Sequence, residues 1–421
     1  MQWVWFDKNL SPIDNLSNMF EKADIRSVVI LIDEYDVPLT YNLENKERFD
    51  SVAEVLKALY STIKYYANKL RFVFITGITR YKDAAFFTLG NTILDVSLDP
   101  TYATIAGLTR DEIKHYYLDN LKYSATKLFN VEFENVSDEM VAGVLDKLEF
   151  YYDGYCFDRL CSKKVFSTWS VLNYFINETS DFLNFWYDSA GLPSILVKNL
   201  DRIKEQLIDL INNEYIYVKS SDFENPSSLA DMQPAVLLYQ TGYLTLAAPS
   251  NKLEYQLTYP NEEVKQALTI QLASQVFSNE SEFRKLRRSP LDDMQTVDEI
   301  VDYFNSILNL VDYEYYPLTS ESAVINSIML FLKGQDKLKV AVNSHSSKGR
   351  CDLQVDSDAR RLVFEFKFAK IDDDVSELLQ KACTQLQDRR YGQSADAKGE
   401  ILQIALVFSQ EQRCITAFEK I

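Results

Sequence analysis

The sequence predicts an α/β protein of two parts, and three observations support this fold class. Near the N-terminus, an aliphatic strand ending in acids (SVVILIDEYD) precedes an amphipathic helix of about twenty residues and a second strand (RFVFITGIT). Near the C-terminus, residues 349–368 alternate apolar and polar side chains as a β-hairpin does, and helical patterns flank them. A chain of 421 residues is also too long for one ordinary core, so two or three domains are expected.

Composition excludes several classes of protein. With 47% hydrophobic and 25% charged residues, the chain shows neither disordered nor collagen-like bias. The longest aliphatic run, Val28–Ile32, is far too short for a membrane span, and no secretory signal opens the chain. The five cysteines form no C-x-x-C pair and only two histidines are present, which argues against a structural zinc site. We therefore expect a cytoplasmic protein with reduced thiols and no membrane partner.

The net charge of −18 argues against broad nonspecific binding of nucleic acid. A local basic strip can still suffice for a specific site. Candidate basic residues are Arg284, Lys285, Arg287, Arg288, Lys348, Arg350, Arg389 and Arg390. For the first four, a solvated helix end or linker is the preferred interpretation.

The N-terminal third predicts two buried parallel strands joined by a helix. The helix is expected from Arg48 to Asn68, between the two strands. The first strand ends at Asp33 and Glu34, and the second ends at Thr76. Acids at the carboxyl end of a parallel strand lie where such sheets bind ligands.

The middle of the chain predicts mostly helices. Thr109 to Glu112 (TRDE) forms a capping box that opens a helix through Tyr117, and Ser167–Thr168 opens another. The many tyrosines of this region are expected to pack in a core or an interface. Proline and charged residues interrupt the helical pattern at 287–294, which indicates a boundary before the last unit.

The C-terminal hairpin gathers acidic and basic side chains on one face. The second strand places Val363, Glu365 and Lys367 on one face, and Leu362, Phe364, Phe366 and Phe368 on the other. A turn at Ser357–Ala359 brings Asp352 opposite Glu365. Paired positions lie about 5 Å apart at Cβ, close enough for two carboxylates to share a divalent cation. An ordinary half-exposed hairpin with one polar face is the alternative interpretation.

Two flanking helices carry polar residues on apolar faces. Glu321 lies on the stripe of Ile325, Ile328 and Leu332, and Gln385 lies on the stripe of Leu378 and Ala382. Such a polar group needs a partner, which a metal–phosphate site would supply. For Glu321, the alternative is an acid favoured by the N-terminal end of the helix dipole.

This order of elements resembles a known enzyme superfamily. A helix with Glu, a strand with Asp, a strand with Glu-x-Lys, a helix with Gln and the strand Ile401–Phe408 resemble the PD-(D/E)XK nuclease superfamily. More closely, they resemble the nuclease domain attached to bacterial AAA-ATPase-like proteins. Five further blocks read like landmarks of that family: LIDEYDVPL, FITGITRYK, YDGYCF, LLYQTGYLTL and TYPNEEV.

The resemblance implies Mg²⁺- or Mn²⁺-dependent hydrolysis of a DNA phosphodiester. Asp352 and Glu365 would hold the metal, and Glu321 would complete its ligand set. Lys367 would position or activate the attacking water, and Gln385 would orient the lysine or a phosphate oxygen. Tyr391 is a weaker candidate for backbone contact. DNA is the expected partner, RNA stays an alternative, and a homo-oligomer is compatible with the sequence.

The resemblance also bears on the N-terminal acids. In P-loop ATPases the residue at Asp33 holds Mg²⁺, the residue at Glu34 polarises water, and Thr76 stands at a sensor position. A P-loop needs G-x-x-x-x-G-K-[ST], and none of the eleven glycines is followed by lysine. The front of the ATPase half is thus expected to be missing, and ATP is not an expected cofactor of this chain. A vestigial metal or capping site is the preferred interpretation of Asp33 and Glu34.

We therefore expect an α/β protein in three segments. Residues 1–125 would form a truncated AAA-ATPase-like domain with a P-loop NTPase-like parallel sheet, residues 126–290 a mostly helical extension, and residues 291–421 a PD-(D/E)XK nuclease-like domain. Two alternatives remain open: a catalytically silent interaction or nucleotide-sensing module, and an ATPase whose P-loop lies upstream of this chain.

Overall fold

The computed structural model divides the chain into two compact units. The residues that the structure describes are 7–42, 45–79, 93–177, 181–186, 196, 210, 215–224, 232–251, 253–287, 291–314, 316–333, 338–346, 349–357, 359–389 and 399–421. One unit contains the described residues up to Val264 apart from Leu210, and the other contains Leu210 and the described residues from Lys265 to Ile421. Within these ranges, no helix is both long enough and apolar enough to cross a membrane.

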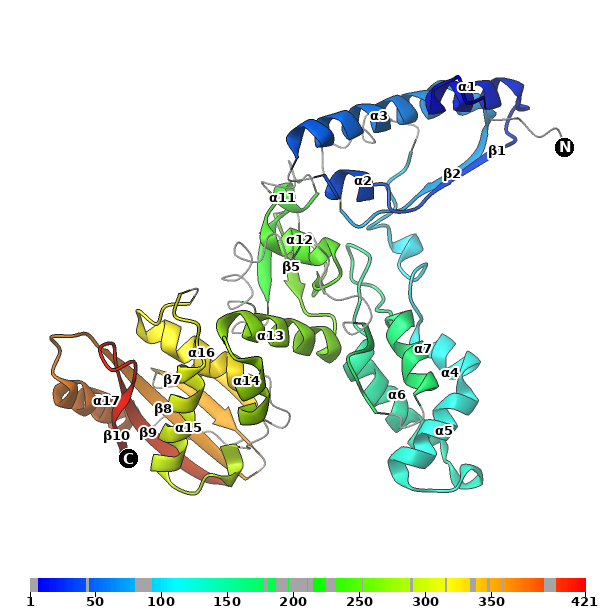
Figure 1. The fold of residues 1–421 in the computed structure, drawn as a ribbon. Helices are drawn as coiled ribbons and strands as arrows, with labels where there is room; N and C mark the ends of the chain where they lie inside the picture. Colours follow the sequence, from blue (N-terminus) through cyan, green and yellow to red (C-terminus); the bar gives the residue numbers. More distant parts are fainter. Residues whose placement is uncertain are drawn as a thin grey trace. The chain divides into compact units, whose positions relative to one another are not determined.

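The N-terminal segment confirms the predicted pair of parallel strands. Its elements are α1 (Pro12–Lys22), β1 (Val28–Ile32), α2 (Val37–Thr40), α3 (Lys46–Tyr65), the 3₁₀ helix η1 (Ala67–Lys69) and β2 (Leu70–Ile75). β1 pairs with β2 in parallel, and the register runs from Val28↔Leu70 to Ile32↔Ile75. The 20-residue helix α3 supplies the crossover connection that parallel neighbours require (Figure 1).

The sequence predicts that strand β1 is buried, and this prediction is wrong for one face of the strand. Val28, Ile30 and Ile32 pack against a cluster that contains Phe20 and Tyr60, residues of α1 and α3. The alternate side chains stay exposed to solvent: Val29 (52%), Leu31 (70%), Phe72 (53%) and Phe74 (40%). Because strand side chains alternate between faces, helices on one side cover only every second residue.

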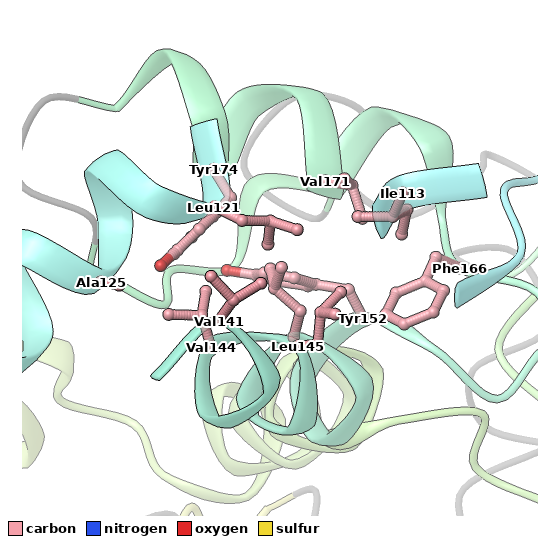
Figure 2. Packing of buried hydrophobic residues seen from close by; sticks show 11 residues of the cluster. Ile113, Leu121, Ala125, Val141, Val144, Leu145, Tyr152, Phe166, Val171 and Tyr174 are labelled. Carbon is pink, nitrogen blue, oxygen red and sulfur yellow. The ribbon is translucent and has the colours of Figure 1, made fainter. Parts of the chain in front are cut away.

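The helical segment packs around one hydrophobic cluster (Figure 2). Its elements are η3 (Pro100–Tyr102), α4 (Arg110–Tyr116), α5 (Leu118–Phe129), η4 (Phe133–Asn135), α6 (Asp138–Tyr152) and α7 (Thr168–Ile176). The capping box of Thr109 and Glu112 is confirmed, as is the N-cap at Ser167. Leu121 and Ala125 pack with Val141 and Leu145, so this core joins residues on both sides of position 125. The predicted domain bounds themselves stay a prediction.

A small antiparallel sheet follows, which the sequence analysis does not predict. Strands β3 (Ile216–Lys219), β4 (Thr245–Leu246) and β5 (Glu254–Thr258) are arranged in the order β3-β5-β4. Helices α11 (Ser220–Glu224) and α12 (Pro234–Gln240) lie between β3 and β4 in the chain, and α13 (Glu262–Val276) follows β5. Strands of two to five residues give too short an alternation to be recognised in the sequence.

The C-terminal unit is built on a five-stranded mixed sheet in the order β10-β9-β8-β7-β6. Its strands are β6 (Lys339–Ser346), β7 (Gly349–Asp356), β8 (Arg360–Ala369), β9 (Glu400–Ser409) and β10 (Cys414–Lys420). Its helical elements are α14 (Glu280–Arg287), η5 (Leu291–Asp293), α15 (Val297–Asn309), α16 (Glu321–Lys333) and α17 (Val375–Arg389). Only β8 and β9 pair in parallel, and α17 forms their crossover.

Both faces of this sheet are covered. Phe364 of β8 packs against Phe304 of α15, with ring centroids 5.0 Å apart. Val363, which points to the opposite face, packs with Ala382 and Leu386 of α17. Strand β8 is therefore buried along most of its length, and the expectation of a half-exposed polar face does not hold for this hairpin.

Candidate functional site

The β7–β8 hairpin has the register that its turn residues predict. The pairs run from Asp356↔Arg361 to Leu353↔Phe364, and Asp352 and Glu365 are the next residues beyond the last pair on their two strands. The Asp352 carboxylate accepts a hydrogen bond from the backbone N–H of Phe366, with Oδ2 and N separated by 2.7 Å. Two carboxylates thus lie on neighbouring strands near the middle of the sheet.

Glu365 is a buried acid with an incomplete set of partners. Its side chain is 3% exposed. Lys367 Nζ donates to Oε1 at 3.1 Å, while Oε2 is buried and has no hydrogen-bond partner within the described residues. Burial, and next the charge of Asp352, raise the pKa of Glu365 to about 7, although the nearby Lys367 acts in the opposite direction. The site therefore holds more negative charge than its lysine neutralises.

Lys367 is the cation of this group. Its Nζ also donates to the backbone carbonyl of Phe366 at 2.8 Å, so the ammonium bridges a side chain and the main chain of its own strand. The contact with Glu365 is an ion pair between two largely buried side chains. Removing Lys367 would leave the buried Glu365 carboxylate without its ion-pair partner, which is costly.

Glu321, the first residue of α16, lies within electrostatic reach of the hairpin group. Burial raises the pKa of Glu321, and so does the charge of Asp352, whereas Lys367 and the backbone N–H of Phe368 lower it. The structure therefore brings the predicted third acid near the other two, although Glu321 precedes Asp352 by 31 positions in the chain.

Gln385 faces the same place from α17. A cavity of about 580 Å³ is lined by Lys367, Glu377, Gln380, Lys381, Thr384 and Gln385. In the part of the chain that the structure describes, the buried Oε1 of Gln385 accepts no hydrogen bond. A buried amide oxygen without a donor is costly, so this oxygen is suited to a ligand or a reoriented lysine in the cavity.

The donor chemistry of this group fits a hard divalent cation. Its candidate ligand atoms are carboxylate oxygens, which Mg²⁺ and Mn²⁺ prefer, and the unpartnered Oε2 of Glu365 is a vacant acceptor. No three acidic, histidine or cysteine side chains among the described residues are gathered into a complete ligand set. The residues that would hold a cation, Asp352 and Glu365, now accept hydrogen bonds from the backbone N–H of Phe366 and from Lys367 Nζ.

Asp33 and Glu34 follow the carboxyl end of β1, and Thr76 follows that of β2, as predicted. The hydroxyl of Thr76 donates to the Asp33 carboxylate and accepts a hydrogen bond from the backbone N–H of Glu34. Glu34 has a left-handed backbone with a φ of 52°, which is strained for a residue other than glycine. Asp33 and Glu34 are both exposed to solvent. Thr76 thus ties the two strand ends together.

Asp36, which the sequence patterns did not single out, has the most buried carboxylate among the described residues of this segment. Asp36 is 1% exposed and accepts hydrogen bonds from the backbone N–H groups of Ile78 (3.1 Å) and Thr79 (2.7 Å) and from the Thr79 hydroxyl. The Tyr35 hydroxyl donates to the Thr79 carbonyl at 2.8 Å. A Cβ on Gly77 would lie 2.4 Å from the Tyr35 ring, so only glycine fits there. The sequence signal was that Asp36 ends the DEYD run of one landmark block and Thr79 lies in the next block.

Several predicted residues lie outside the described ones: Arg288, Lys348, Arg390 and Tyr391. The side chains of Arg284, Arg287, Arg350 and Arg389 are likewise outside the described part. Lys285 is exposed, and its Nζ lies 3.9 Å from Glu282 Oε2, one helical turn away. This contact agrees with a solvated helix end.

Comparisons with known proteins match both ends of the chain. Residues 7–87 match the model of a family described as "Predicted AAA-ATPase", and residues 320–418 match a model of the PD-(D/E)XK nuclease superfamily. A protein of Azotobacter chroococcum mcd 1, described as "Uncharacterized protein in vnfD 5'region", is 23% identical over 430 residues, which cover 98% of this chain and 75% of the relative. No solved structure matches.

The matches confirm the architecture expected from the sequence. An AAA-ATPase-like segment precedes a PD-(D/E)XK nuclease superfamily segment, and the second contains Glu321, Asp352, Glu365, Lys367 and Gln385. The superfamily is one of nucleases, so its presence indicates an enzyme. Of the larger parallel sheet expected for the first segment, the described residues contain the two strands β1 and β2.

Proposed function

We propose that the C-terminal unit hydrolyses phosphodiester bonds of DNA with the help of Mg²⁺ or Mn²⁺. The observation that carries this proposal is Glu365, a buried carboxyl with one oxygen unpartnered among the described residues, opposite Asp352 and beside Lys367. The superfamily match over residues 320–418 supports the same reaction.

Asp352 and Glu365 are the proposed ligands of the cation, and Glu321 is the proposed third. When bound, a divalent cation supplies Lewis-acid activation of a water molecule and of the phosphate. The excess negative charge of the three carboxyls favours a cation, since burial and mutual repulsion raise the pKa of Glu365 and of Glu321. Holding a cation would relieve this repulsion.

Lys367 and Gln385 are the proposed residues that act on the reacting groups. Lys367 lines the cavity while donating to Glu365, so its ammonium can bind a phosphate oxygen or orient the attacking water. The unpartnered amide oxygen of Gln385 can accept a hydrogen bond from that ammonium and fix its direction.

The outer side of α17 is the proposed contact surface for the nucleic acid backbone. Gln380, Lys381 and Thr384 line the cavity beside Lys367, and all three can donate hydrogen bonds to phosphate oxygens. Lys381 now pairs with Glu377, with Nζ and Oε1 separated by 2.7 Å, and this exposed pair is weak enough to exchange for a phosphate. Such local contacts suit a protein whose net charge is −18.

In the AAA-ATPase-like segment, Asp33, Glu34 and Thr76 are the proposed nucleotide-associated positions. Their placement at the ends of two parallel strands supports the assignment. ATP turnover by this chain is not part of the proposal, because none of its eleven glycines is followed by the lysine of a P-loop.

A plasmid-nicking assay tests the proposed nuclease. Supercoiled DNA is incubated with Mg²⁺ or Mn²⁺ and with the parent protein, Asp352→Asn, Lys367→Ala, or Lys370→Ala, in which an exposed lysine of the same segment is removed as a matched control. We expect nicking by the parent and Lys370→Ala and loss of nicking in the other two.

Equal nicking by all four proteins would contradict the proposal, since it would indicate a contaminating nuclease. Absence of nicking by the parent on plasmid, linear and single-stranded DNA would favour the silent interaction module. A parallel assay with single-stranded RNA separates DNA from RNA as the substrate.

A further inference from the structure

Cys156 and Cys161 bring their sulfur atoms into contact in the first unit. The two Sγ atoms lie 3.0 Å apart, and both cysteines are free thiols. The spacing in the sequence is C-x-x-x-x-C, which gave no reason to expect a pair. A disulfide has an S–S length of about 2.05 Å, so the sulfurs need to approach by only about 1 Å to form one.

The backbone between the cysteines is held in the shape that makes this contact. Cys161 has a left-handed backbone with a φ of 46°, and its N–H donates to the Asp158 carbonyl at 3.0 Å. The Asp158 side chain is fully buried and accepts hydrogen bonds from Leu160 N (2.8 Å) and Ser162 N (3.0 Å). The turn is thus stabilised by a carboxylate placed inside it.

Strand β4 fixes both sulfur-bearing residues from the other side. Thr245 Oγ1 accepts from Cys156 N at 2.8 Å and donates to the Cys156 carbonyl at 3.4 Å. Cys161 Sγ lies 3.4 Å from the carbonyl oxygen of Leu246. The turn and the distant strand β4 both hold the pair, so the contact does not depend on the turn alone.

The two thiols differ in accessibility and in acidity. Cys156 is fully buried, whereas Cys161 is partly exposed. The hydrogen bond between the sulfurs lowers the pKa of Cys156 and raises that of Cys161. A small oxidant can therefore reach the pair from the side of Cys161.

We propose that Cys156 and Cys161 form a redox-active dithiol, which peroxides convert to a disulfide within the folded protein. Hydrogen peroxide transfers one oxygen to one sulfur of the pair, which gives a sulfenic acid and one water. The other sulfur then attacks the sulfenic sulfur, the S–S bond forms, and the displaced hydroxide leaves as a second water with the proton of the attacking thiol. Two thiols are oxidised, and one peroxide is reduced to two waters.

Peptide mapping tests this proposal, because Arg159 lies between the two cysteines. Trypsin cleaves after Lys147, Arg159 and Lys163, so Cys156 and Cys161 fall in peptides 148–159 and 160–163. The native protein is treated with stoichiometric peroxide, unfolded in the presence of N-ethylmaleimide, which blocks the remaining thiols, and digested without reductant. We expect the two peptides to stay joined and to separate on reduction, and cross-linking to be on the order of tenfold faster than in the urea-unfolded chain.

Two variants sharpen the result. Cys161→Ser removes the exposed partner and should abolish the cross-linked peptide, whereas Cys414→Ser removes another partly exposed cysteine and should leave it unchanged. The proposal is overturned if the unfolded chain cross-links as fast as the folded one. It is equally overturned if Cys161 of the native chain is converted to sulfinic acid while Cys156 stays alkylated.

Discussion

The two groups of acids in this protein lie in opposite environments. Asp33 and Glu34 follow β1, which pairs with β2 and has one exposed face among the described residues, and both acids are exposed to solvent. Glu365 lies in the third of five strands, is 3% exposed, and is covered by helices on both faces of the sheet. Both groups were selected from the sequence by the same criterion, an acid at a strand position suited to a metal.

For these two groups, the hydrogen-bond partners of an acid indicate its role better than its sequence motif does. In the N-terminal group, Thr76 and Thr79 donate to Asp33 and Asp36, so these acids stabilise two strand ends. In the C-terminal group, burial and repulsion between carboxyls are only partly relieved by Lys367. The first arrangement is satisfied within the protein, and the second is suited to a cation.

The largest expected effect comes from Glu365→Gln, which breaks the C-terminal group. Loss of a ligand for the cation should lower the nicking rate by on the order of 10²–10³-fold. The folded protein should be as stable as the parent or more so at pH 8, because a buried charge is removed while the shape is kept. Nicking rates and urea unfolding measured together check both statements. A variant that is inactive because it is unfolded would contradict them.

Asp36→Ala should have the opposite effect: it should lower the stability of the N-terminal segment and leave the nicking rate nearly unchanged. It leaves the N–H groups of Ile78 and Thr79 and the Thr79 hydroxyl without their buried acceptor, at a cost of roughly 3–5 kcal/mol. Nicking by the other unit should change little. Hydrogen exchange of the Ile78 and Thr79 amides measures the local loss. Asp33→Ala, at an exposed site, is the control, and equal acceleration in both variants would show that Asp36 has no special role.

A smaller effect is expected in the pH dependence of stability. The pKa of Glu365 is about 7 in the folded protein and near 4.5 when unfolded, so between these values the folded state binds more protons. The free energy of unfolding should therefore fall as pH rises from 4.5 to 7, by roughly 2–3 kcal/mol. The protonated carboxyl contributes fully below pH 4.5 and nothing above pH 7.

Urea unfolding at several pH values measures this slope. Asp153, whose pKa burial raises to about 6, contributes in the same direction and serves as an internal reference in the other unit. Glu365→Gln should reduce the slope of the unit that contains it and leave the rest. An unchanged slope in that unit would mean that Glu365 is ionised in the fold without penalty.

Much of the fold followed from local patterns, and the exceptions have physical causes. The hairpin register and the caps at Thr109 and Ser167 were predicted because they depend on turn and capping residues close in sequence. The short strands β3 and β4 were missed because their alternation is too brief. Gln385 and Glu321 were recognised as polar residues on apolar helix faces, and both reach the hairpin group.

The sequence alone determined which side chains share a strand face and which residues begin the helices, because these properties depend on neighbours a few residues apart. The tertiary fold, in contrast, packs α17 against β8, brings Thr79 to Asp36 and holds Cys156 against Cys161. Burial and electrostatic free energy are set by groups that arrive from distant parts of the chain. The strand positions of the acids could therefore be predicted from nearby residues, whereas their burial and pKa values could not.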